Sequence, residues 1–442
     1  MPRPIAQCSS THAAPRRLAQ GPVGPGRARV CYVLCTAVRI TAIETLRLEE
    51  FPNLLHVRVH TDEGLTGLGE TFFGARAVEA YLHESAAPAL LGKDPLRIDE
   101  HAQALHGYVG YGSTGAEMRG ASAIDIALWD LLGQVTGQPL YQLLGGRVRE
   151  TARTYNTCAG YTYVRSRPVQ AVDNWGLPAS QSPAAQGPYE DLDAFLHRPD
   201  ELARSLLDEG FTGMKIWPFD PFAEASGGHF ISAADLRTAL EPFRKIRKAV
   251  GDRIDIMVEF HSLWDLPTAR RICRALEEYE PFWFEDPLKA DNLDALAELA
   301  SHTMVPLTLS ETIAGRWRFK ELMDRHAVGV VMLDVSWVGG ISEARHVAAL
   351  ADTHKLPFAP HDCTGPVTLV TSTHLSVHAR NALVQEVVRA FYSTWYRDLV
   401  TELPDIGHGR IAPPEGPGLG TALQPGIERR PDASVTWSRL GD

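Results

Sequence analysis

The sequence predicts an α/β protein in which a barrel of parallel strands and helices follows a smaller α+β domain. The barrel is predicted first by three short apolar runs, IDIMVEF, PFWFEDP and VPLTLSET, which carry Glu259, Glu285 and Glu311 at or near their ends. These acids are spaced by 26 and 26 residues. A strand, a helix and two loops occupy about that length, so the spacing is typical of consecutive βα units.

The same period continues toward the C-terminus. The next three apolar runs reach Asp334, His361 and Glu386 after 23, 27 and 25 residues. Because a barrel places the C-terminal ends of its strands on one rim, we expect all six side chains at the barrel mouth. Three carboxylates there would repel one another without a cation, and all-oxygen ligation favours Mg²⁺ over Zn²⁺. The alternative is three unrelated surface acids at loop starts, which the regular spacing disfavours.

The composition is that of a folded, soluble protein. The 442 residues are 44% hydrophobic and 22% charged, a length that suffices for a barrel and a second domain. The formal net charge of −11 argues against nucleic acid or an anionic membrane as the main partner. No apolar run reaches the roughly 18 to 20 residues of a membrane span. Six cysteines without CxxC pairs indicate reduced thiols, so we expect a cytoplasmic protein without disulfides.

Four segments are predicted along the chain. We expect residues 1–36 to be a disordered extension, 37–150 an α+β capping domain, 151–390 the barrel, and 391–442 a segment that completes the capping domain. Alternating residues around the turn DEG predict a β-meander over residues 37–72. Helical periodicity follows in AVEAYLHESAAPALLG and ASAIDIALWDLLGQVTG.

The first part of the barrel carries the candidate substrate contacts. The first strand is predicted to end near Asn156, which we expect to contact the substrate. Residues 161–197 are rich in Pro, Ser and Gln and too long for an ordinary loop, which indicates a lid, a binding element or disorder. The second strand reaches Lys215 and Trp217, and the alternation of a strand puts both on one face. Residues 49–55 and 72–77 have no obvious core role; they either cover the barrel mouth or are ordinary exposed loop residues.

These motifs resemble the enolase superfamily, in its mandelate racemase and muconate lactonizing branch, over about residues 37–425. The resemblance rests on the order and spacing of ASAIDIALWDLLGQVTGQPLYQLLGG, the lysine of the second strand, FEDP, SET, DVSWVGGI and APHDCTGP. It implies a (β/α)7β-type modified TIM barrel with an α+β capping domain. It also implies a homo-oligomer, dimeric or octameric, that acts on a small-molecule hydroxycarboxylate.

The resemblance assigns roles to the strand-end residues. It implies that Mg²⁺ and, through it, the substrate carboxylate are held by three acids: Glu259, Glu285 and Glu311. Asp334 would orient His361 as a base, and Glu386 would hydrogen-bond the intermediate. Removing a proton next to a carboxylate forms an enediolate dianion, which near pH 7 needs a cation and hydrogen-bond donors already in place. Taken alone, Asp334 and His361 would be interpreted as a structural ion pair or as loop residues, but their place at adjacent strand ends opposite a metal site favours the base assignment.

The second strand departs from the family pattern. Racemases and cycloisomerases of this branch have Lys-x-Lys there, whereas this chain has Lys215-Ile216-Trp217. A tryptophan cannot accept a proton, so the pattern disfavours racemisation by two bases. Lys215 could still bind the substrate carboxylate, or act as the base in place of His361. Trp217 could pack against the substrate or fill the barrel interior.

His261 points to a different reaction. Glu259-Phe260-His261 resembles the Asp-Phe-His of galactonate dehydratases in the same superfamily, where the histidine protonates the leaving 3-hydroxyl. His261 follows Glu259 by two residues, so both can face the barrel mouth, and histidine titrates near neutrality as such an acid must. The alternative is a histidine that bonds a neighbouring carboxylate for packing.

We therefore predict a lyase, a Mg²⁺-dependent acid sugar dehydratase that forms a 2-keto-3-deoxy acid. His361 would take the C2 proton, Mg²⁺ and Glu386 would stabilise the enediolate, and His261 would assist departure of the 3-hydroxyl. One alternative is a racemase, epimerase or cycloisomerase that uses the same intermediate and exchanges the C2 proton without dehydration. A second alternative is a catalytically idle, metal-bound barrel used for binding or regulation.

Overall fold

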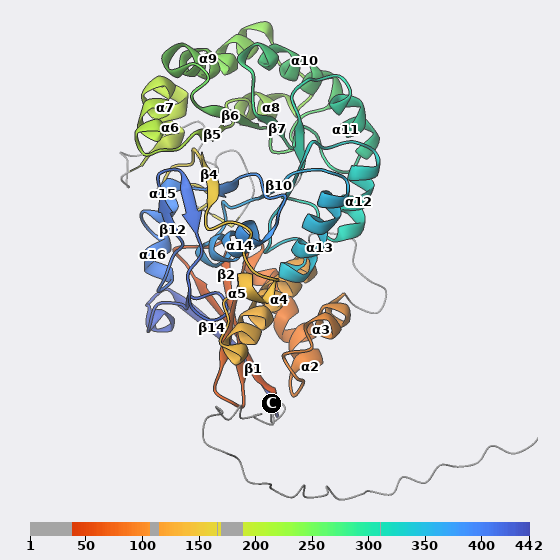
Figure 1. The fold of residues 1–442 in the computed structure, drawn as a ribbon, viewed down its shortest axis with the longest axis vertical. Coiled ribbons are helices and arrows are strands. Elements are labelled where there is room, and N and C mark those ends of the chain that lie inside the picture. The colour runs from red at the N-terminus through yellow and green to blue at the C-terminus, as the bar shows by residue number, and fades with distance from the viewer. Residues whose placement is uncertain (1–37, 107–114, 166, 169–188, 310) are drawn as a thin grey trace, which may run out of the picture. The chain divides into compact units, whose positions relative to one another are not determined.

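The computed structural model describes residues 38–106, 115–165, 167–168, 189–309 and 311–442 (Figure 1). The predicted extension over residues 1–36 and most of the stretch 161–197 lie outside the described residues. Within the described ranges, no helix is long and apolar enough to cross a membrane.

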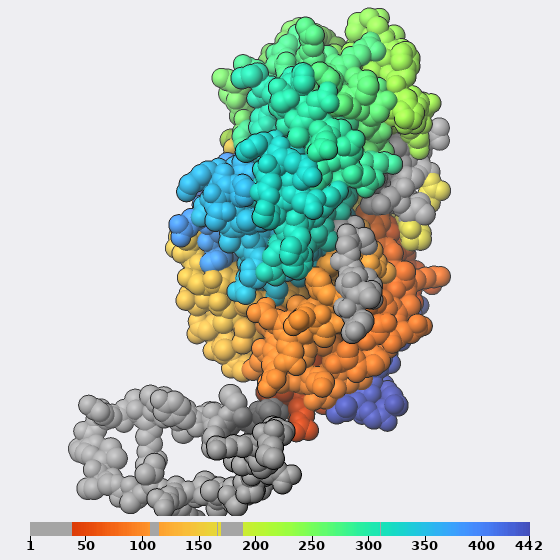
Figure 2. Space-filling view, turned by 90° about the vertical axis from the view of Figure 1, so that its right-hand side faces the viewer, coloured from red at the N-terminus to blue at the C-terminus, as the bar shows by residue number. Residues whose placement is uncertain are grey.

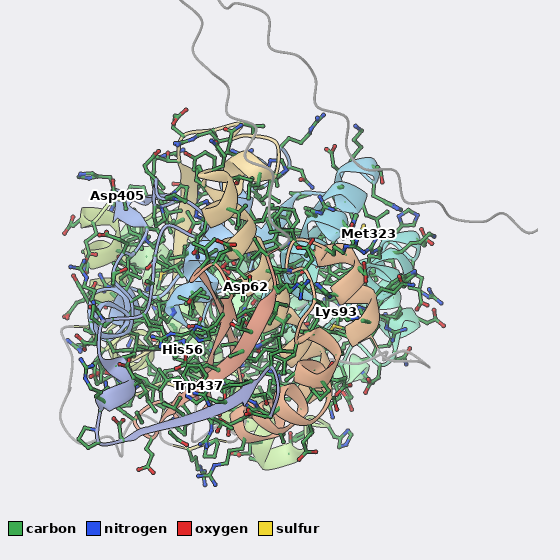
Figure 3. The ribbon with its side chains drawn as sticks, turned by 90° about the horizontal axis from the view of Figure 1, so that it is seen from below. His56, Asp62, Lys93, Met323, Asp405 and Trp437 are labelled. Atoms are coloured by element: carbon green, nitrogen blue, oxygen red, sulfur yellow. The ribbon has the colours of Figure 1, made fainter. Side chains whose placement is uncertain are left out.

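A four-stranded antiparallel sheet forms the centre of the capping domain. Its strands, in the spatial order β14-β1-β2-β3, are β14 (Ala433–Arg439), β1 (Ile40–Leu48), β2 (Leu54–Thr61) and β3 (Thr66–Phe72). The predicted meander over residues 37–72 is confirmed, and the C-terminal strand β14 pairs with β1 along its whole length. Figure 3 looks onto this sheet, with Trp437 on β14 and His56 on β2 labelled.

The helices of the capping domain lie on this sheet or pack against the helices that do. They are α1 (Ala75–Tyr81), a π-helical turn (Leu82–Ala86), α2 (Ala87–Leu90), α3 (Ile98–Leu105), α4 (Ala116–Thr136) and α5 (Leu140–Leu143). The long helix α4 lies directly on β3 because Gly67 and Gly69 present no side chain to it. A Cβ added at Gly69 would meet the carbonyl oxygen of Ala123 at 1.9 Å, so the close approach requires glycine.

Eight parallel strands form the barrel. They are β4 (Ala152–Thr157), β5 (Gly213–Ile216), β6 (Asp255–Glu259), β7 (Trp283–Glu285), β8 (Leu307–Leu309), β9 (Val330–Leu333), β10 (Phe358–Pro360) and β11 (Gln385–Val387). Consecutive strands pair from β4 to β10, and β11 returns to pair with β4. A parallel bridge between Phe358 of β10 and Ala382, just before β11, joins the two ends of the sheet.

Helices alternate with these strands around the outside of the barrel (Figure 1). They are α6 (Asp191–His197), α7 (Pro199–Asp208), α8 (Asp220–Ser226), α9 (Ala233–Val250), α10 (Leu266–Leu276), α11 (Leu293–Ala300), α12 (Arg316–Asp324), α13 (Gly340–Thr353) and α14 (Pro366–His378). The irregular stretch expected over residues 161–197 is therefore wrong at its end, because 191–197 form helix α6. Short helices α15 (Arg389–Tyr392) and α16 (Tyr396–Leu399) and the hairpin of β12 (Asp405–Gly407) and β13 (Arg410–Ala412) follow.

A small cluster of side chains fills the barrel interior below the mouth: Tyr155, Met257, Trp283, Val330, Met332, Ala359 and Val384. This apolar plug leaves the polar strand-end residues above it, on the rim where barrel active sites form. The cysteines of the described part, Cys158, Cys273 and Cys363, are buried and free.

The capping domain and the barrel meet along α4 and β3. Asp125 of α4 accepts a hydrogen bond from the backbone N–H of Ser342 in α13 at 3.0 Å, and Glu70 of β3 accepts one from Thr368 N in α14 at 2.9 Å. Figure 2 shows the junction on one face, where orange residues of the capping domain lie against blue-green residues of the barrel. These buried acids satisfy the free N–H groups of two barrel helices and so hold the capping domain in place.

The carboxylate of Asp130 links α4 to β3 and to the C-terminal segment by hydrogen bonds. Replacing Asp130 should therefore destabilise the protein. Its carboxylate is 2% exposed and accepts from Leu68 N at 2.9 Å, Leu419 N at 2.8 Å and Gln134 Nε2 at 2.9 Å. Asp130→Ala would leave two buried N–H groups unpaired, so we expect the free energy of unfolding to fall by about 2 to 5 kcal/mol in urea titrations.

Two variants control this measurement. Asp130→Asn keeps an acceptor oxygen and should cost less than the alanine variant. Asp294→Ala removes a carboxylate that is 90% exposed and should stay within about 0.5 kcal/mol of wild type. Equal stability of Asp130→Ala and wild type would show that these three bonds do not hold the segments together.

Candidate active site

The predicted strand-end residues converge on the mouth of the barrel. Glu259 and Glu285 are the last residues of neighbouring strands β6 and β7 and stand in register with each other. Asp334 and His361 directly follow β9 and β10, and Glu311 follows β8 by two residues. The predicted strand positions are therefore confirmed. Trp217 lies just beyond β5, which ends at Ile216.

Lys215 of β5 is the cation at the centre of this site. Its Nζ lies 2.6 Å from Glu285 Oε1, 2.9 Å from Glu386 Oε1 and 3.5 Å from Glu259 Oε2. Burial disfavours the charged ammonium, but Glu285 and Glu386 outweigh burial and raise the pKa of Lys215 well above its usual range. One ammonium thus faces three buried carboxyl groups, which is an excess of acids over cations.

That excess fits a divalent cation. Burial raises the pKa of Glu259 to about 7, and burial together with the charge of Glu259 raises the pKa of Glu285 well above its usual value. Two adjacent buried carboxyl groups resist ionisation because their charges would repel each other, and a bound cation would remove that repulsion. Both groups offer oxygen atoms, which are the ligands that Mg²⁺ prefers. Among the described residues, no three candidate ligands are arranged around one point. Lys215 contacts both Glu259 and Glu285, so a metal ion bound to these acids would compete with its ammonium group.

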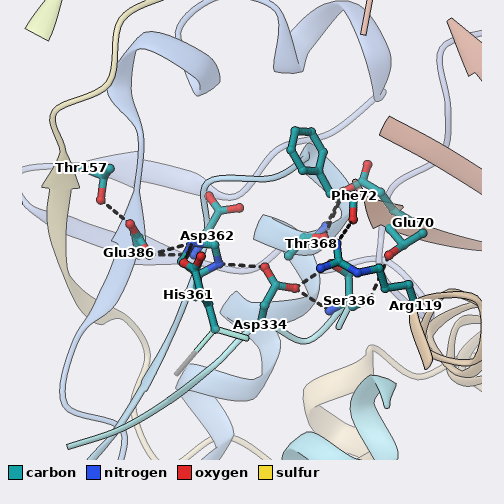
Figure 4. A network of polar contacts seen from close by, with 12 residues as sticks. Glu70, Phe72, Arg119, Thr157, Asp334, Ser336, His361, Asp362, Thr368 and Glu386 are labelled. Atoms are coloured by element: carbon teal, nitrogen blue, oxygen red, sulfur yellow. Dashed lines mark hydrogen bonds and ion pairs between the residues drawn. The ribbon is translucent and has the colours of Figure 1, made fainter. Parts of the chain in front are cut away.

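Glu311, the third acid, faces His361 in this structure. His361 Nε2 lies 2.7 Å from Glu311 Oε2. Its Nδ1 lies 2.8 Å from Asp334 Oδ2, a contact that Figure 4 shows. Asp334 also accepts from the backbone N–H and hydroxyl of Ser336, at 2.7 and 2.6 Å, so its position is fixed. Burial disfavours charge on the imidazole, but Glu311 and Glu386 outweigh burial and raise the pKa of His361 well above its usual value.

Glu386 of β11 lies between Lys215 and His361, with Oε1 2.9 Å from Lys215 Nζ and Oε2 3.9 Å from His361 Nε2. Besides Lys215, it accepts from Thr157 Oγ1 and from the backbone N–H of Asp362, the latter at 2.9 Å. Burial opposes its ionisation, but Lys215 and His361 outweigh burial and lower its pKa. An ionised Glu386 accepts hydrogen bonds and cannot donate them.

His261 lies beside Glu259 and is bonded to a second aspartate. Its backbone N–H donates to Glu259 Oε1 at 2.7 Å, and its Nδ1 lies 2.7 Å from Asp220 Oδ2. The indole of Trp217 packs edge-on against the imidazole, with ring centroids 5.9 Å apart. Trp217 is 1% exposed, so it forms part of the wall around His261.

Asn156 is engaged in a structural network. Its Nδ2 donates to Asp191 Oδ2 at 2.9 Å, and its Oδ1 accepts from Arg389 N at 2.8 Å. The guanidinium of Arg389 in turn pairs with both oxygens of Asp191 at 2.7 Å. The role of Asn156 in substrate binding stays a prediction.

Two charged residues near the site were not predicted. Asp220 is the first residue of α8, three residues after Trp217. The only sequence signal for its position was the order of strands and helices, which places the segment after β5 at the barrel mouth. Arg119 of α4 stacks over Trp337 at 4.3 Å, and the Trp337 ring lies 5.6 Å from that of His361. Burial lowers the pKa of Arg119 to about 10 although Asp334 and Glu311 oppose the shift. No local pattern in α4 signals this contact across domains.

The family assignment follows from matches over most of the chain. Residues 33–145 match the mandelate racemase / muconate lactonizing enzyme N-terminal domain, and residues 199–427 match the enolase C-terminal domain-like family. The chain belongs to the mandelate racemase and muconate lactonizing branch of the enolase superfamily. As a member of this superfamily it is an enzyme, and the predicted α/β barrel with a capping domain is confirmed.

Similar proteins include solved structures and proteins named as dehydratases. An enolase of the mandelate racemase subgroup from Agrobacterium tumefaciens is 53% identical, with a TM-score of 0.80 over 91% of this chain and 99% of that one. An enolase from the Sargasso Sea environmental genome is 46% identical, with a TM-score of 0.80 over 92% and 100%. The D-galactonate dehydratase of Ralstonia pickettii (strain 12J) is 30% identical over 90% of this chain and 95% of its own length.

Proposed function

We propose that the protein is a Mg²⁺-dependent dehydratase of an acid sugar, an aldonate or aldarate, that forms a 2-keto-3-deoxy acid. The observation that carries the proposal is a pair of histidines at one barrel mouth, each bonded through Nδ1 to a buried aspartate. His361 pairs with Asp334 at 2.8 Å and His261 with Asp220 at 2.7 Å. Dehydration needs a base and an acid on one substrate. The relationship to D-galactonate dehydratases supports the same reaction class.

In the proposed mechanism His361 removes the proton from C2. Asp334 occupies Nδ1, so Nε2 is the atom that meets the substrate. Nε2 contacts Glu311 at 2.7 Å, so Glu311 must turn away before the base can act, and its proposed role as a metal ligand requires the same movement. Since the charge of Glu311 helps to raise the pKa of His361, this separation would lower that pKa toward the range of a useful base.

Proton loss creates a second negative charge beside the substrate carboxylate. Held by Glu259, Glu285 and Glu311, Mg²⁺ would supply positive charge at this point. Lys215 provides a second cation from the protein itself, and Glu386 holds that ammonium at 2.9 Å. Because Glu386 is an acceptor, its part is to position Lys215 rather than to donate to the enediolate.

The reaction is completed by loss of the 3-hydroxyl. The C3–O bond breaks as His261 gives its proton to the oxygen, water leaves, and the resulting enol tautomerises to the 2-keto acid. The His261 side chain is 11% exposed, so it is open to a bound substrate. Trp217 stands beside it where a racemase has its second lysine, which favours elimination over transfer of a proton to the opposite face.

Replacing His261 with asparagine tests the acid role. We expect His261→Asn to slow 2-keto acid formation by about 10²- to 10⁴-fold and to leave C2 proton exchange by His361 intact. A substrate with fluoride in place of the 3-hydroxyl needs less acid assistance, so its elimination should persist in the variant. The measurements are 2-keto acid and fluoride release, with deuterium uptake at C2 followed by NMR.

His229→Asn is the matched control, since His229 pairs with Asp265 on the same side of the barrel but its side chain is 77% exposed. That variant should behave as wild type. Equal loss on both substrates in His261→Asn would mean that the imidazole only shapes the site. Unchanged activity on both would assign His261 to packing.

A further inference from the structure

Asp220 is a buried carboxylate with one described partner. It begins helix α8 and is fully buried, and its Oδ2 lies 2.7 Å from His261 Nδ1. Its Oδ1 has no hydrogen-bond partner among the described residues. A buried carboxylate bonded this sparsely is costly for folding, so stability does not explain its presence. Its one described contact is instead directed at a residue of the site.

His261 contacts Asp220 from a turn that also holds its own backbone. His261 and Ser262 both adopt left-handed φ values, 48° and 58°, in the turn that follows β6. In this turn the His261 N–H donates to Glu259 Oε1 at 2.7 Å. The edge of Trp217 packs against the imidazole, and Asp220 bonds Nδ1 at 2.7 Å. The bond to Asp220 therefore restrains rotation of the ring about its own axis.

We propose that Asp220 is the positioning residue for His261, the counterpart of Asp334 for His361. This inference rests on the proposed function, because it assigns to Asp220 the task of aiming the proposed acid at the 3-hydroxyl. With Nδ1 bonded to Asp220, Nε2 is the ring atom left to face the substrate. The inference also explains why a tryptophan is suited to position 217. A lysine there would bring an ammonium group near Asp220 that would compete with His261 for its carboxylate.

The test compares exchange with elimination in Asp220 variants. Asp220→Ala removes the anchor, and Asp220→Asn keeps the shape with one acceptor oxygen in case the alanine variant does not fold. Both are assayed with Mg²⁺ in deuterated water on a panel of sugar acids that includes D-galactonate. We expect 2-keto acid formation to fall by about 10²-fold in Asp220→Ala, less in Asp220→Asn, while deuterium uptake at C2 stays near the wild-type rate.

A structural role would not produce that split. Asp265→Asn is the control, since Asp265 also pairs with a histidine, at 3.1 Å, and caps α10, where asparagine serves as well. Equal loss of exchange and elimination in the Asp220 variants, or no loss of either, overturns the positioning role.

The proposed function can fail separately, if wild type eliminates water from no acid of the panel. The crystal structure of Asp220→Ala then decides the positioning claim. A rotated His261 ring supports it, and an unmoved ring overturns it.

Discussion

His361→Asn should abolish both C2 deuterium uptake and 2-keto acid formation. Asp334 bonds the imidazole at the barrel mouth, and a general base of this kind contributes about 10²- to 10⁴-fold to the rate. Asp334→Asn should lower both rates less, because the ring remains but loses the carboxylate that orients it. The measurements are NMR of the C2 position in deuterated water and a colorimetric assay of the 2-keto acid.

A control histidine separates base loss from general damage. His378 lies at the far end of α14 and bonds Gly146 O at 3.0 Å, so His378→Asn should retain both rates. Continued C2 exchange in His361→Asn would show that another base operates, and Lys215 is then the group to replace.

Glu285→Gln should remove Mg²⁺-dependent stabilisation together with activity. Glu285 is fully buried beside Glu259, and the amide keeps the acceptor for Trp283 Nε1 at 2.9 Å while losing the charge. With Mg²⁺ at 100 times its Kd, wild type gains about 2.7 kcal/mol of stability, whereas a variant that binds 100-fold more weakly gains about 0.4 kcal/mol. Thermal unfolding with and without Mg²⁺ measures this difference without any substrate.

Glu298→Gln is the control for this pair of measurements. Glu298 is an exposed acid of α11 that pairs with Arg270, so its variant should keep the full Mg²⁺ effect. A Glu285→Gln variant with wild-type Mg²⁺ stabilisation and turnover would remove Glu285 from the metal site.

Mg²⁺ affinity should also depend on pH. Because burial raises the pKa of Glu259 to about 7, the metal-free acid is partly protonated at neutral pH. The ion binds the carboxylate form, so binding releases protons and the affinity should rise between about pH 6 and about pH 8. Titration calorimetry in buffers of different ionisation enthalpy counts the protons. An affinity that does not change across this interval would contradict the release of a proton from Glu259 when Mg²⁺ binds.

The sequence predicted the positions of the site residues well because a βα barrel repeats in sequence. Each unit has nearly the same length, so Glu259, Glu285, Asp334 and His361 appear at regular spacings and end neighbouring strands in the structure. The antiparallel meander was predictable from a different signal, the alternation of apolar and polar residues around a turn.

Side-chain partners could not be predicted from that repeat. Glu311 has the correct position but bonds His361, because rotation about its side-chain torsions is set by neighbouring charges rather than by strand register. Neighbouring charges also explain why Lys215 bonds Glu285, one of the acids that were assigned to the metal. Arg119 contacts Trp337 across the two domains, a distance of more than two hundred residues along the chain that no local pattern spans.

The most direct test of the account is the wild-type reaction with a panel of mono- and diacid sugars, with Mg²⁺ in deuterated water. The account predicts that at least one acid forms a 2-keto-3-deoxy product with one deuterium at C3, since the enol takes its final proton from solvent. Deuterium uptake at C2 with recovery of an unreacted or epimerised acid would favour a racemase or epimerase instead. Mg²⁺-dependent thermal stabilisation by an acid without uptake or product would contradict an enzymatic role for these two histidines.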